Sequence, residues 1–397
     1  MKRLVACLIV ALVAACTEST PAPTTEAPPT PETSAVPPTT TTEPTPPPDR
    51  FRTSTTTDDL GWEHVTLPEG TGPYAGVIAW TGEELIFWGG DDSLSVPRGE
   101  PGLAYDLDTG MWRELSPSPK RATQGAASVW TGSELIICCG ARSSFTAVSY
   151  DPVTDRWRAL SDPPTSGEYL EAVWTGDVML VAGPGGVMSY DPVSDVWTEQ
   201  PNPPRALGRL NAVAWTGSEL VVWPATIERH VHVGMALSPE TGLWRDLGEP
   251  PAWPAGVDIA WTGEDLIIWG GLPALSGGSE RAVGSRLNWE EDHWYELPEA
   301  LPEPDGCECN LGSQELLWTG RELLVWTGFF STGYESGEPL LLSYRPDTGA
   351  WYVVAESPIE WSGQSLMADN RIVIKGDDSL AISPAGWGSD GTPLDLS

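Results

Sequence analysis

The tripeptide Trp-Thr-Gly recurs along this chain, and each copy stands in the same setting. Small and apolar residues precede it and an apolar run follows it, as in residues 77–90. The copies begin at Trp80, Trp130, Trp174, Trp215, Trp261 and Trp318. Self-similarity with a period of roughly 40 to 60 residues is typical of repeat architectures, in which each unit is one supersecondary structure. The repeat therefore decides the fold class before any other feature of the sequence.

One unit, residues 127–160, predicts four antiparallel strands. Residues 127–130 and 135–138 are short apolar runs on either side of a Thr-Gly turn, which is the pattern of a β-hairpin. A third strand ends at Tyr150, an Asp-Pro turn follows, and a fourth strand carries Trp157. Because one such sheet has two open edges and buries little alone, copies stacked in a closed ring are the stable arrangement. We interpret each repeat as a propeller blade, with another all-β solenoid or a sandwich as the alternative.

The two ends of the repeat region are complementary. Residues 61–67 match a fourth strand that no other strands precede, whereas residues 363–383 match three strands that no fourth follows. We expect the strand after Trp62 to lie beside residues 380–383 and to complete the last blade. The predicted fold is an all-β, seven-bladed β-propeller of four-stranded antiparallel blades, occupying residues 60–397.

A tyrosine in the third strand and a tryptophan in the fourth recur together, as at Tyr105 and Trp112, and Gly89 and Gly90 end a second strand. This combination resembles the kelch repeat, and through it the seven-bladed propeller of galactose oxidase. The resemblance covers nearly all of residues 60–390, and it implies binding through the face that carries the longer loops. Galactose oxidase holds copper with Tyr and His ligands, but no residue of this sequence can be assigned to them. His64 and His293, beside fourth-strand tryptophans, are interpreted as structural.

The first residues predict export and lipidation. Lys2 and Arg3 precede an apolar stretch that is typical of a signal peptide and too short to span a membrane. The following Val-Ala-Ala-Cys16 resembles the bacterial lipobox, with ordinary secretion and nearby cleavage as the alternative. We predict a signal peptide over residues 1–15, and a lipid-anchored, Thr/Pro-rich disordered tether over residues 16–59. The propeller is then held at the extracytoplasmic face of the bacterial cell membrane.

The charge balance is strongly acidic and restricts the partners. Asp and Glu number 56 against 21 Lys and Arg, a net charge of −35. Such a charge disfavours nucleic acid and anionic lipid as partners. We expect membrane contact through the lipid anchor alone, and a monomer.

Connections on one face of the predicted ring are longer and more varied than those on the other. The second-to-third and fourth-to-first connections share that face, and variable loops on a rigid scaffold usually carry binding. They hold arginines and aromatics, which supply planar donors and rigid contact area. Taken singly, each arginine could instead balance neighbouring carboxylates. The predicted ligand face comprises Arg121, Arg142, Tyr169, Arg209, Arg229, His230, His232, Trp253, Arg281, Phe330 and Tyr334.

Four cysteines belong to the same face. Cys138 and Cys139 end a second strand, and Cys307 and Cys309 lie in a fourth-to-first connection. In an oxidising compartment cysteines are paired by default, and four allow three pairings. Two local bridges avoid the distance across the channel mouth but require strained rings. Together with the two histidines of the predicted face, these cysteines could instead bind Zn or Cu. We favour disulfides, and we expect no cofactor.

The sequence contains no Ser-His-Asp order, nucleophile elbow or phosphate-binding glycine loop. Two function hypotheses remain. The first is a surface-tethered, non-catalytic binding module for protein or glycan ligands. The alternative is a secreted, metal-dependent oxidase of the galactose oxidase type, or a hydrolase that acts on carbohydrate. Because no set of metal ligands can be assigned, we favour the first.

Overall fold

A computed structural model describes most of the repeat region. The described residues are 49–59, 61–68, 76–89, 102–120, 125–140, 147–165, 170–225, 233–252, 255–271, 282–298, 311–329, 340–356, 364–376 and 378–386. They belong to one unit, residues 48–397. Within them the chain forms strands and turns, and no helix that could cross a membrane is present in this part.

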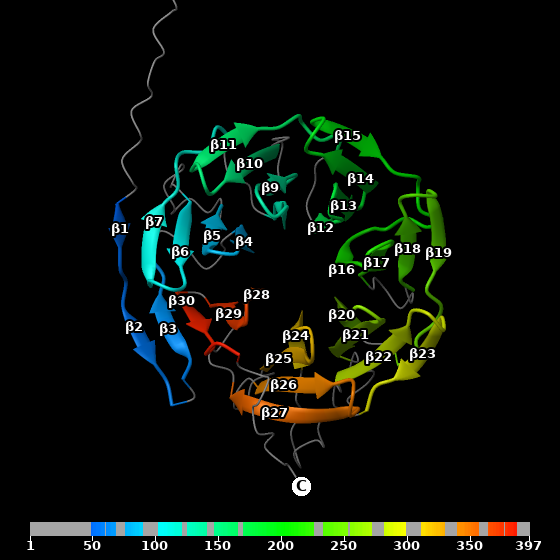
Figure 1. The fold of residues 1–397 in the computed structure, drawn as a ribbon. Coiled ribbons are helices and arrows are strands. Elements are labelled where there is room, and N and C mark those ends of the chain that lie inside the picture. The colour runs from blue at the N-terminus through cyan, green and yellow to red at the C-terminus, as the bar shows by residue number, and fades with distance from the viewer. Residues whose placement is uncertain are drawn as a thin grey trace, which may run out of the picture. The chain divides into compact units, whose positions relative to one another are not determined.

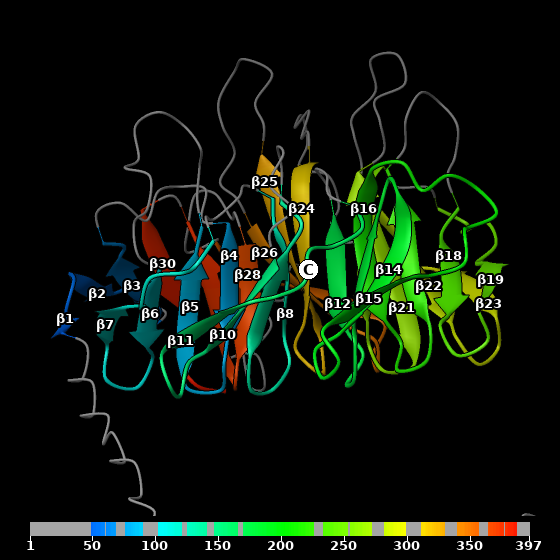
Figure 2. The same ribbon diagram turned by 90° about the horizontal axis from the view of Figure 1, so that it is seen from above.

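Seven antiparallel sheets are arranged as the blades of a β-propeller, with the first strand of each blade innermost (Figure 1). This confirms the predicted fold class. Figure 2 shows the strands side-on, with the short described turns gathered at one end of the ring. We number the blades 1 to 7 in chain order. Their strands are, in blade 1, β4 (Val77–Trp80), β5 (Glu84–Trp88), β6 (Leu103–Asp106) and β7 (Met111–Glu114); in blade 2, β8 (Ala127–Trp130), β9 (Leu135–Cys138), β10 (Ala147–Asp151) and β11 (Arg156–Ala159); in blade 3, β12 (Glu171–Trp174), β13 (Met179–Gly183), β14 (Gly186–Asp191) and β15 (Val196–Glu199); in blade 4, β16 (Leu210–Trp215), β17 (Leu220–Pro224), β18 (Met235–Ser238) and β19 (Leu243–Asp246); in blade 5, β20 (Ala255–Trp261), β21 (Asp265–Gly271), β22 (Ala282–Asn288) and β23 (His293–Glu296); in blade 6, β24 (Leu311–Trp318), β25 (Leu323–Phe329), β26 (Leu340–Arg345) and β27 (Ala350–Glu356); in blade 7, β28 (Gln364–Ala368), β29 (Arg371–Lys375), β30 (Ser379–Ile382) and β3 (Glu63–Thr66).

Blade 7 is composite, as the sequence predicts. Strand β3 pairs antiparallel with β30, and Val65 stands opposite Leu380. Trp62, directly before β3, is fully buried between blades 6 and 7, in a cluster with Trp326 and Ile372. Residues from the two ends of the described chain therefore close the ring in a single sheet.

Two further strands precede β3 and extend the sheets of blades 1 and 7. Strand β1 (Arg50–Phe51) pairs with the outer edge of β7, and β2 (Thr55–Thr57) pairs with the outer edge of β3. Both blades are therefore five-stranded. The predicted boundary at residue 60 places both strands in the tether, whereas the structure places them on the propeller.

The Trp-Thr-Gly signature forms the turn between the first two strands of a blade. In blade 1 the Thr81 hydroxyl donates to the Glu84 carbonyl at 3.0 Å and accepts the Glu84 amide at 3.0 Å. Gly82 has a φ of +95°, which glycine adopts without steric cost. The hydroxyl contact recurs at Thr131, Thr175, Thr216, Thr262 and Thr319. The motif therefore stabilises the turn between the first two strands, and it recurs because each of these blades contains that turn.

Neighbouring blades share apolar cores. Second-strand tryptophans contact fourth-strand tryptophans of the next blade, as in Trp88 with Trp157, whose ring centroids lie 5.2 Å apart. Trp269 and Trp351 form the same contact at 4.4 Å. These large side chains fill the seams between blades, and buried aromatic pairs of this kind stabilise beyond their area.

Indole hydrogen bonds complete the same seams. Trp157 Nε1 donates to the carbonyl of Ser116, which follows the fourth strand of the preceding blade, at 2.8 Å. The bond recurs at Trp197, Trp244, Trp294 and Trp351. In blade 1 the acceptor is the Thr53 hydroxyl, 3.1 Å from Trp112 Nε1. The segment that joins β1 to β2 thus supplies the bond at the seam between blades 7 and 1.

Candidate functional site

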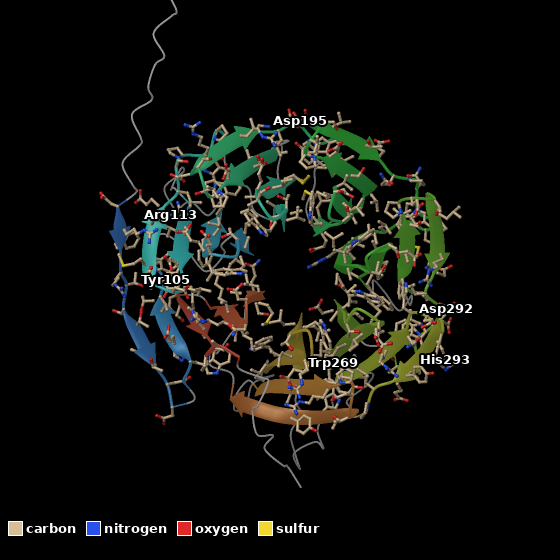
Figure 3. All side chains as sticks on the ribbon, in the orientation of Figure 1. Tyr105, Arg113, Asp195, Trp269, Asp292 and His293 are labelled. Atoms are coloured by element: carbon tan, nitrogen blue, oxygen red, sulfur yellow. A yellow bond between two sulfur atoms is a disulfide. The ribbon has the colours of Figure 1, made fainter. Side chains whose placement is uncertain are left out.

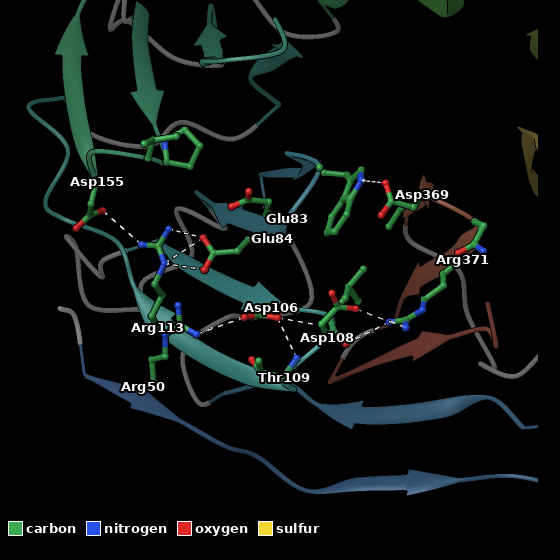
Figure 4. Close-up of a pocket in the computed structure, with 17 residues that line it drawn as sticks. Arg50, Glu83, Glu84, Asp106, Asp108, Thr109, Arg113, Asp155, Asp369 and Arg371 are labelled. Carbon is green, nitrogen blue, oxygen red and sulfur yellow. Dashed lines mark hydrogen bonds and ion pairs between the residues drawn. The ribbon is translucent and has the colours of Figure 1, made fainter. Parts of the chain in front are cut away.

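The first-to-second and third-to-fourth turns form what we term the short-turn face, and the other connections form the loop face. A hollow of about 800 Å³ opens on the short-turn face. Turns of blades 1, 2 and 7 line it (Figure 4). We take this hollow as the candidate site.

Arg113 of β7 forms the wall of the hollow towards blade 2. Its Nη2 lies 2.5 Å from Glu84 Oε2, and its Nη1 lies 3.5 Å from Asp155 Oδ1 of the next blade. Arg113 also donates to the Tyr150 hydroxyl at 3.2 Å. Burial alone would lower the pKa of Arg113, but its hydrogen bonds to Glu84 outweigh this and raise that pKa. The guanidinium therefore stays charged and is held by carboxylates on two blades.

The opposite wall crosses the seam between blades 7 and 1. Arg371 of β29 donates to the Leu107 carbonyl at 3.2 Å and lies 3.7 Å from an Asp108 carboxylate oxygen. Trp80 Nε1 donates to Asp369 Oδ1 at 3.2 Å. Figure 4 shows these pairs on the side of the hollow away from Arg113. The contacts tie the ring at its closure.

Asp106 lies between the two walls. It accepts backbone N–H bonds from Asp108 and Thr109 at 3.0 and 2.9 Å and lies 3.3 Å from Arg50 of β1. Partial burial would raise the pKa of Asp106, but the hydrogen bonds from Thr109 and Asp108 outweigh it and lower that pKa. Its carboxylate is thus ionised and committed to the turn.

The ion pairs that Arg113 forms with Glu84 and Asp155 have counterparts elsewhere in the ring. The residue after the fourth-strand tryptophan pairs with the carboxylate after the Thr-Gly turn at Arg158–Glu134 and Arg245–Glu219, as it does at Arg113–Glu84. Arg245 also reaches Asp292 of the following blade at 3.2 Å. The repetition assigns these ion pairs to the assembly of the ring.

Carboxylates nevertheless outnumber guanidinium groups in the hollow. The carboxylates belong to Glu83, Glu84, Asp106, Asp108, Asp155 and Asp369, and the guanidinium groups to Arg50, Arg113 and Arg371. Among the described residues no group of three or more His, Cys, Asp or Glu side chains has the arrangement of a metal site. The hollow would therefore accept a cationic group more readily than an anionic one.

One carboxyl on an innermost strand was not anticipated from the sequence. Glu171 stands on β12, an innermost strand, at its loop-face end. Its surface reaches solvent, yet surrounding protein desolvates it and raises its pKa. This register position holds acids in two other blades, at Asp258 and Glu315. It holds Val77, Ala127 and Ala212 in blades 1, 2 and 4. Aligning the repeats on Trp-Thr-Gly would have shown that an acid stands three residues before the tryptophan in blades 3, 5 and 6.

Two of the predicted cysteines are joined in the structure. The sulfurs of Cys138 and Cys139 form a vicinal disulfide, and both side chains are buried. Arg209 is exposed beside the start of β16, where its carbonyl accepts the Ala225 amide at 2.8 Å. Its place at the start of a first strand puts it on the loop face.

The remaining predicted residues fall outside the described residues. They are Cys16, Cys307, Cys309, Arg121, Arg142, Tyr169, Arg229, His230, His232, Trp253, Arg281, Phe330 and Tyr334. The predicted ligand face therefore stays a prediction.

The two histidines interpreted as structural lie on fourth strands. His64 Nε2 lies 3.1 Å from Asp58 Oδ2 and fastens the turn between β2 and β3. His293 packs edge-on against Tyr295, and Figure 3 places it with Asp292 at the outer part of the ring. Asp195 occupies the same outer region of blade 3, where it accepts the Tyr190 hydroxyl at 2.7 Å.

Comparison with known proteins supports the fold alone. No protein-family model matches this sequence, and no curated protein matches it. Among solved structures, an oligogalacturonate lyase in complex with manganese is similar, with a TM-score of 0.56 and 13% identity over 85% of this chain and 98% of that one. The hydrazine synthase of Kuenenia stuttgartiensis is similar, with a TM-score of 0.56 and 13% identity over 79% of this chain and 96% of that one.

Proposed function

We propose that this chain is a lipid-anchored, extracytoplasmic β-propeller of the kelch type that binds a protein or glycan ligand without catalysis. The observation that carries the proposal is the contrast between the two faces. On the short-turn face a Thr hydroxyl of each Thr-Gly turn, together with several Asp carboxylates and arginines, is engaged in turns and seams, as Thr81, Asp106 and Arg113 illustrate. The longer connections join strand ends at the loop face. A rigid ring with varied loops on one side is suited to recognition.

The kelch assignment is supported by the third-strand tyrosine and the fourth-strand tryptophan. Their ring centroids lie 4.6 Å apart in Tyr105–Trp112 and 4.8 Å apart in Tyr150–Trp157. The same pair occurs at Tyr190–Trp197 and Tyr344–Trp351. The sequence pair on which the resemblance rests is therefore a packed pair in space.

The anchor is tested by Cys16→Ser. Wild-type protein should be recovered with membranes and carry a lipid, whereas the variant should be released or remain unprocessed. Equal fractionation and equal migration of the two proteins would contradict lipidation at this residue.

Ligand binding is tested with the purified Cys16→Ser chain on glycan and peptide arrays. Once a ligand is identified, alanine substitutions at Arg209, Trp253 and Tyr334 should weaken it, with losses of about 1 kcal/mol or more at a few positions. The control is Glu83→Ala on the short-turn face, which should leave the affinity unchanged. Loss of affinity in the control alone would place the ligand in the hollow and overturn the assignment of the face.

A second candidate function, a carbohydrate-active enzyme, is favoured by Glu171 alone. A carboxyl whose pKa is raised by desolvation can remain protonated long enough to serve as a general acid. Turnover of an oligosaccharide by the wild type, with loss in Glu171→Gln at unchanged stability, would support this function over the first. Binding without turnover would support the first.

A further inference from the structure

The vicinal disulfide closes the second strand of blade 2. Cys138 is the last residue of β9 and pairs with Ala147 of β10, and Cys139 follows it. The two side chains are 1% and 0% exposed. Since the bond joins neighbouring residues, it constrains almost none of the unfolded chain. Its effect must therefore be local, at the end of β9.

Cys139 occupies a backbone conformation that favours glycine. Its φ is +73°, in the left-handed region. In blade 1, Val77 pairs with Trp88 as Ala127 pairs with Cys138, so Gly89 stands where Cys139 stands. Gly89 has a φ of +92°. Glycine adopts this region freely, whereas a residue with a Cβ is penalised. The disulfide holds a cysteine where blade 1 uses glycine.

The disulfide also fills a seam. In blade 1 the equivalent of Cys138 is Trp88, which packs on Trp157 of the next blade. In blade 2 both cysteines belong to the core shared with blade 3, together with Met188 and Trp197. The two sulfurs therefore take the place of an indole ring. Both the end of β9 and the packing between blades 2 and 3 depend on the same bond.

We propose that the Cys138–Cys139 bond is a redox-sensitive lock on the end of β9. Oxidised, it fixes the left-handed residue and seats both sulfurs between blades 2 and 3. A dithiol reductant opens it by thiolate attack on one sulfur, followed by displacement of the mixed disulfide by its second thiol. Two electrons and two protons pass to the cysteines, and the reductant becomes a disulfide. Once the disulfide is broken, the backbone of Cys139 leaves the left-handed region and the end of β9 opens.

The test is hydrogen exchange of the β9 backbone, followed by mass spectrometry in the full chain. Cys307→Ser and Cys309→Ser are introduced throughout, so that neither can contribute a disulfide. Dithiothreitol is the reductant, and peptide mass after alkylation reports the state of the bond. Two variants are compared with this background protein. Cys139→Gly removes the bond, but glycine still adopts the left-handed conformation freely. Cys139→Ala removes the bond and keeps the Cβ that disfavours this conformation.

Reduction should speed exchange at the end of β9 by about tenfold in the background protein, because the left-handed residue is no longer held. Cys139→Ala should exchange at the fast rate with or without reductant. Cys139→Gly should exchange slowly in both conditions. Three results would overturn the lock: a bond that resists dithiothreitol until the propeller unfolds, unchanged exchange after complete reduction, or equally fast exchange in Cys139→Gly and Cys139→Ala.

Discussion

Replacing Arg113 by methionine should destabilise the propeller far more than the same replacement at Arg158. The two arginines hold the same repeat position, one residue after the fourth-strand tryptophan, and each pairs with the carboxylate after a Thr-Gly turn. Their surroundings differ. The side chains of Arg113 and Glu84 are 6% and 14% exposed, whereas those of Arg158 and Glu134 are 44% and 35% exposed.

The expected magnitudes follow from this difference in burial. Removing one partner of a buried ion pair leaves an uncompensated charge and costs about 3–5 kcal/mol. An exposed pair is screened by water and contributes only about 0.2–1 kcal/mol. Arg245–Glu219, at 34% and 19% exposure, should fall between the two. Replacing both partners with apolar residues, as in Arg113→Met with Glu84→Leu, should recover most of the loss, because the more deeply buried carboxylate is removed together with its partner.

The assay is urea unfolding followed by tryptophan fluorescence, with the slope of each transition compared before free energies are derived. All chains carry Cys16→Ser, which removes the proposed lipidation site from the comparison. Equal costs at Arg113 and Arg158 would refute the argument from burial. A double variant no more stable than Arg113→Met alone would show that the loss arises from packing rather than from the stranded carboxylate.

Three further predictions concern closure and charge. Trp62→Ala should cost about 3–5 kcal/mol, because the side chain is fully buried between blades 6 and 7; a urea midpoint equal to wild type would contradict closure by this residue. Deleting residues 50–57 should lower the thermal midpoint while leaving the far-ultraviolet circular dichroism close to native, since β3 remains; loss of the β signal would show that the ring needs both strands. Desolvation raises the pKa of Glu171 in the folded protein above its unfolded value of 4.5. Ionisation of this carboxyl therefore destabilises the folded state at pH values above 4.5. Glu171→Gln should therefore be more stable than wild type near neutral pH and equal to it below that value, and the opposite pH trend in urea midpoints would exclude a desolvated carboxyl.

Repetition made most of the fold predictable. The Trp-Thr-Gly turn repeats its hydroxyl contact wherever it occurs, so one unit was enough to place the strands of the others. The composite blade was predictable because residues 61–67 carry Trp62, a fourth-strand signature. Strands β1 and β2 were missed for a physical reason. An edge strand is held by backbone hydrogen bonds, and the exposed Thr55–Thr57 shows no apolar alternation that could reveal it.

The site was less predictable, because its pairs depend on register and on the seams between blades. Arg113 meets Glu84 across three strands of one blade and Asp155 across a seam, and no local pattern indicates either contact. The vicinal disulfide stood among three possible pairings. Glu171 stands three residues before Trp174, a position that the repeats reveal, but its desolvation arises only in the folded chain.

The order of β1, β2 and β3 along the outside of the ring has a mechanical consequence. A pull applied through the residues before Arg50 enters the propeller at β1, whose pairing with β7 involves two residues of each strand. It passes next to β2 on blade 7, and then to β3, the strand that closes the ring. Such a force would thus detach β1 and β2 before it acts on β3. The strands at the amino-terminal end of the described chain would therefore detach in order, and the two-residue pairing of β1 would be lost first.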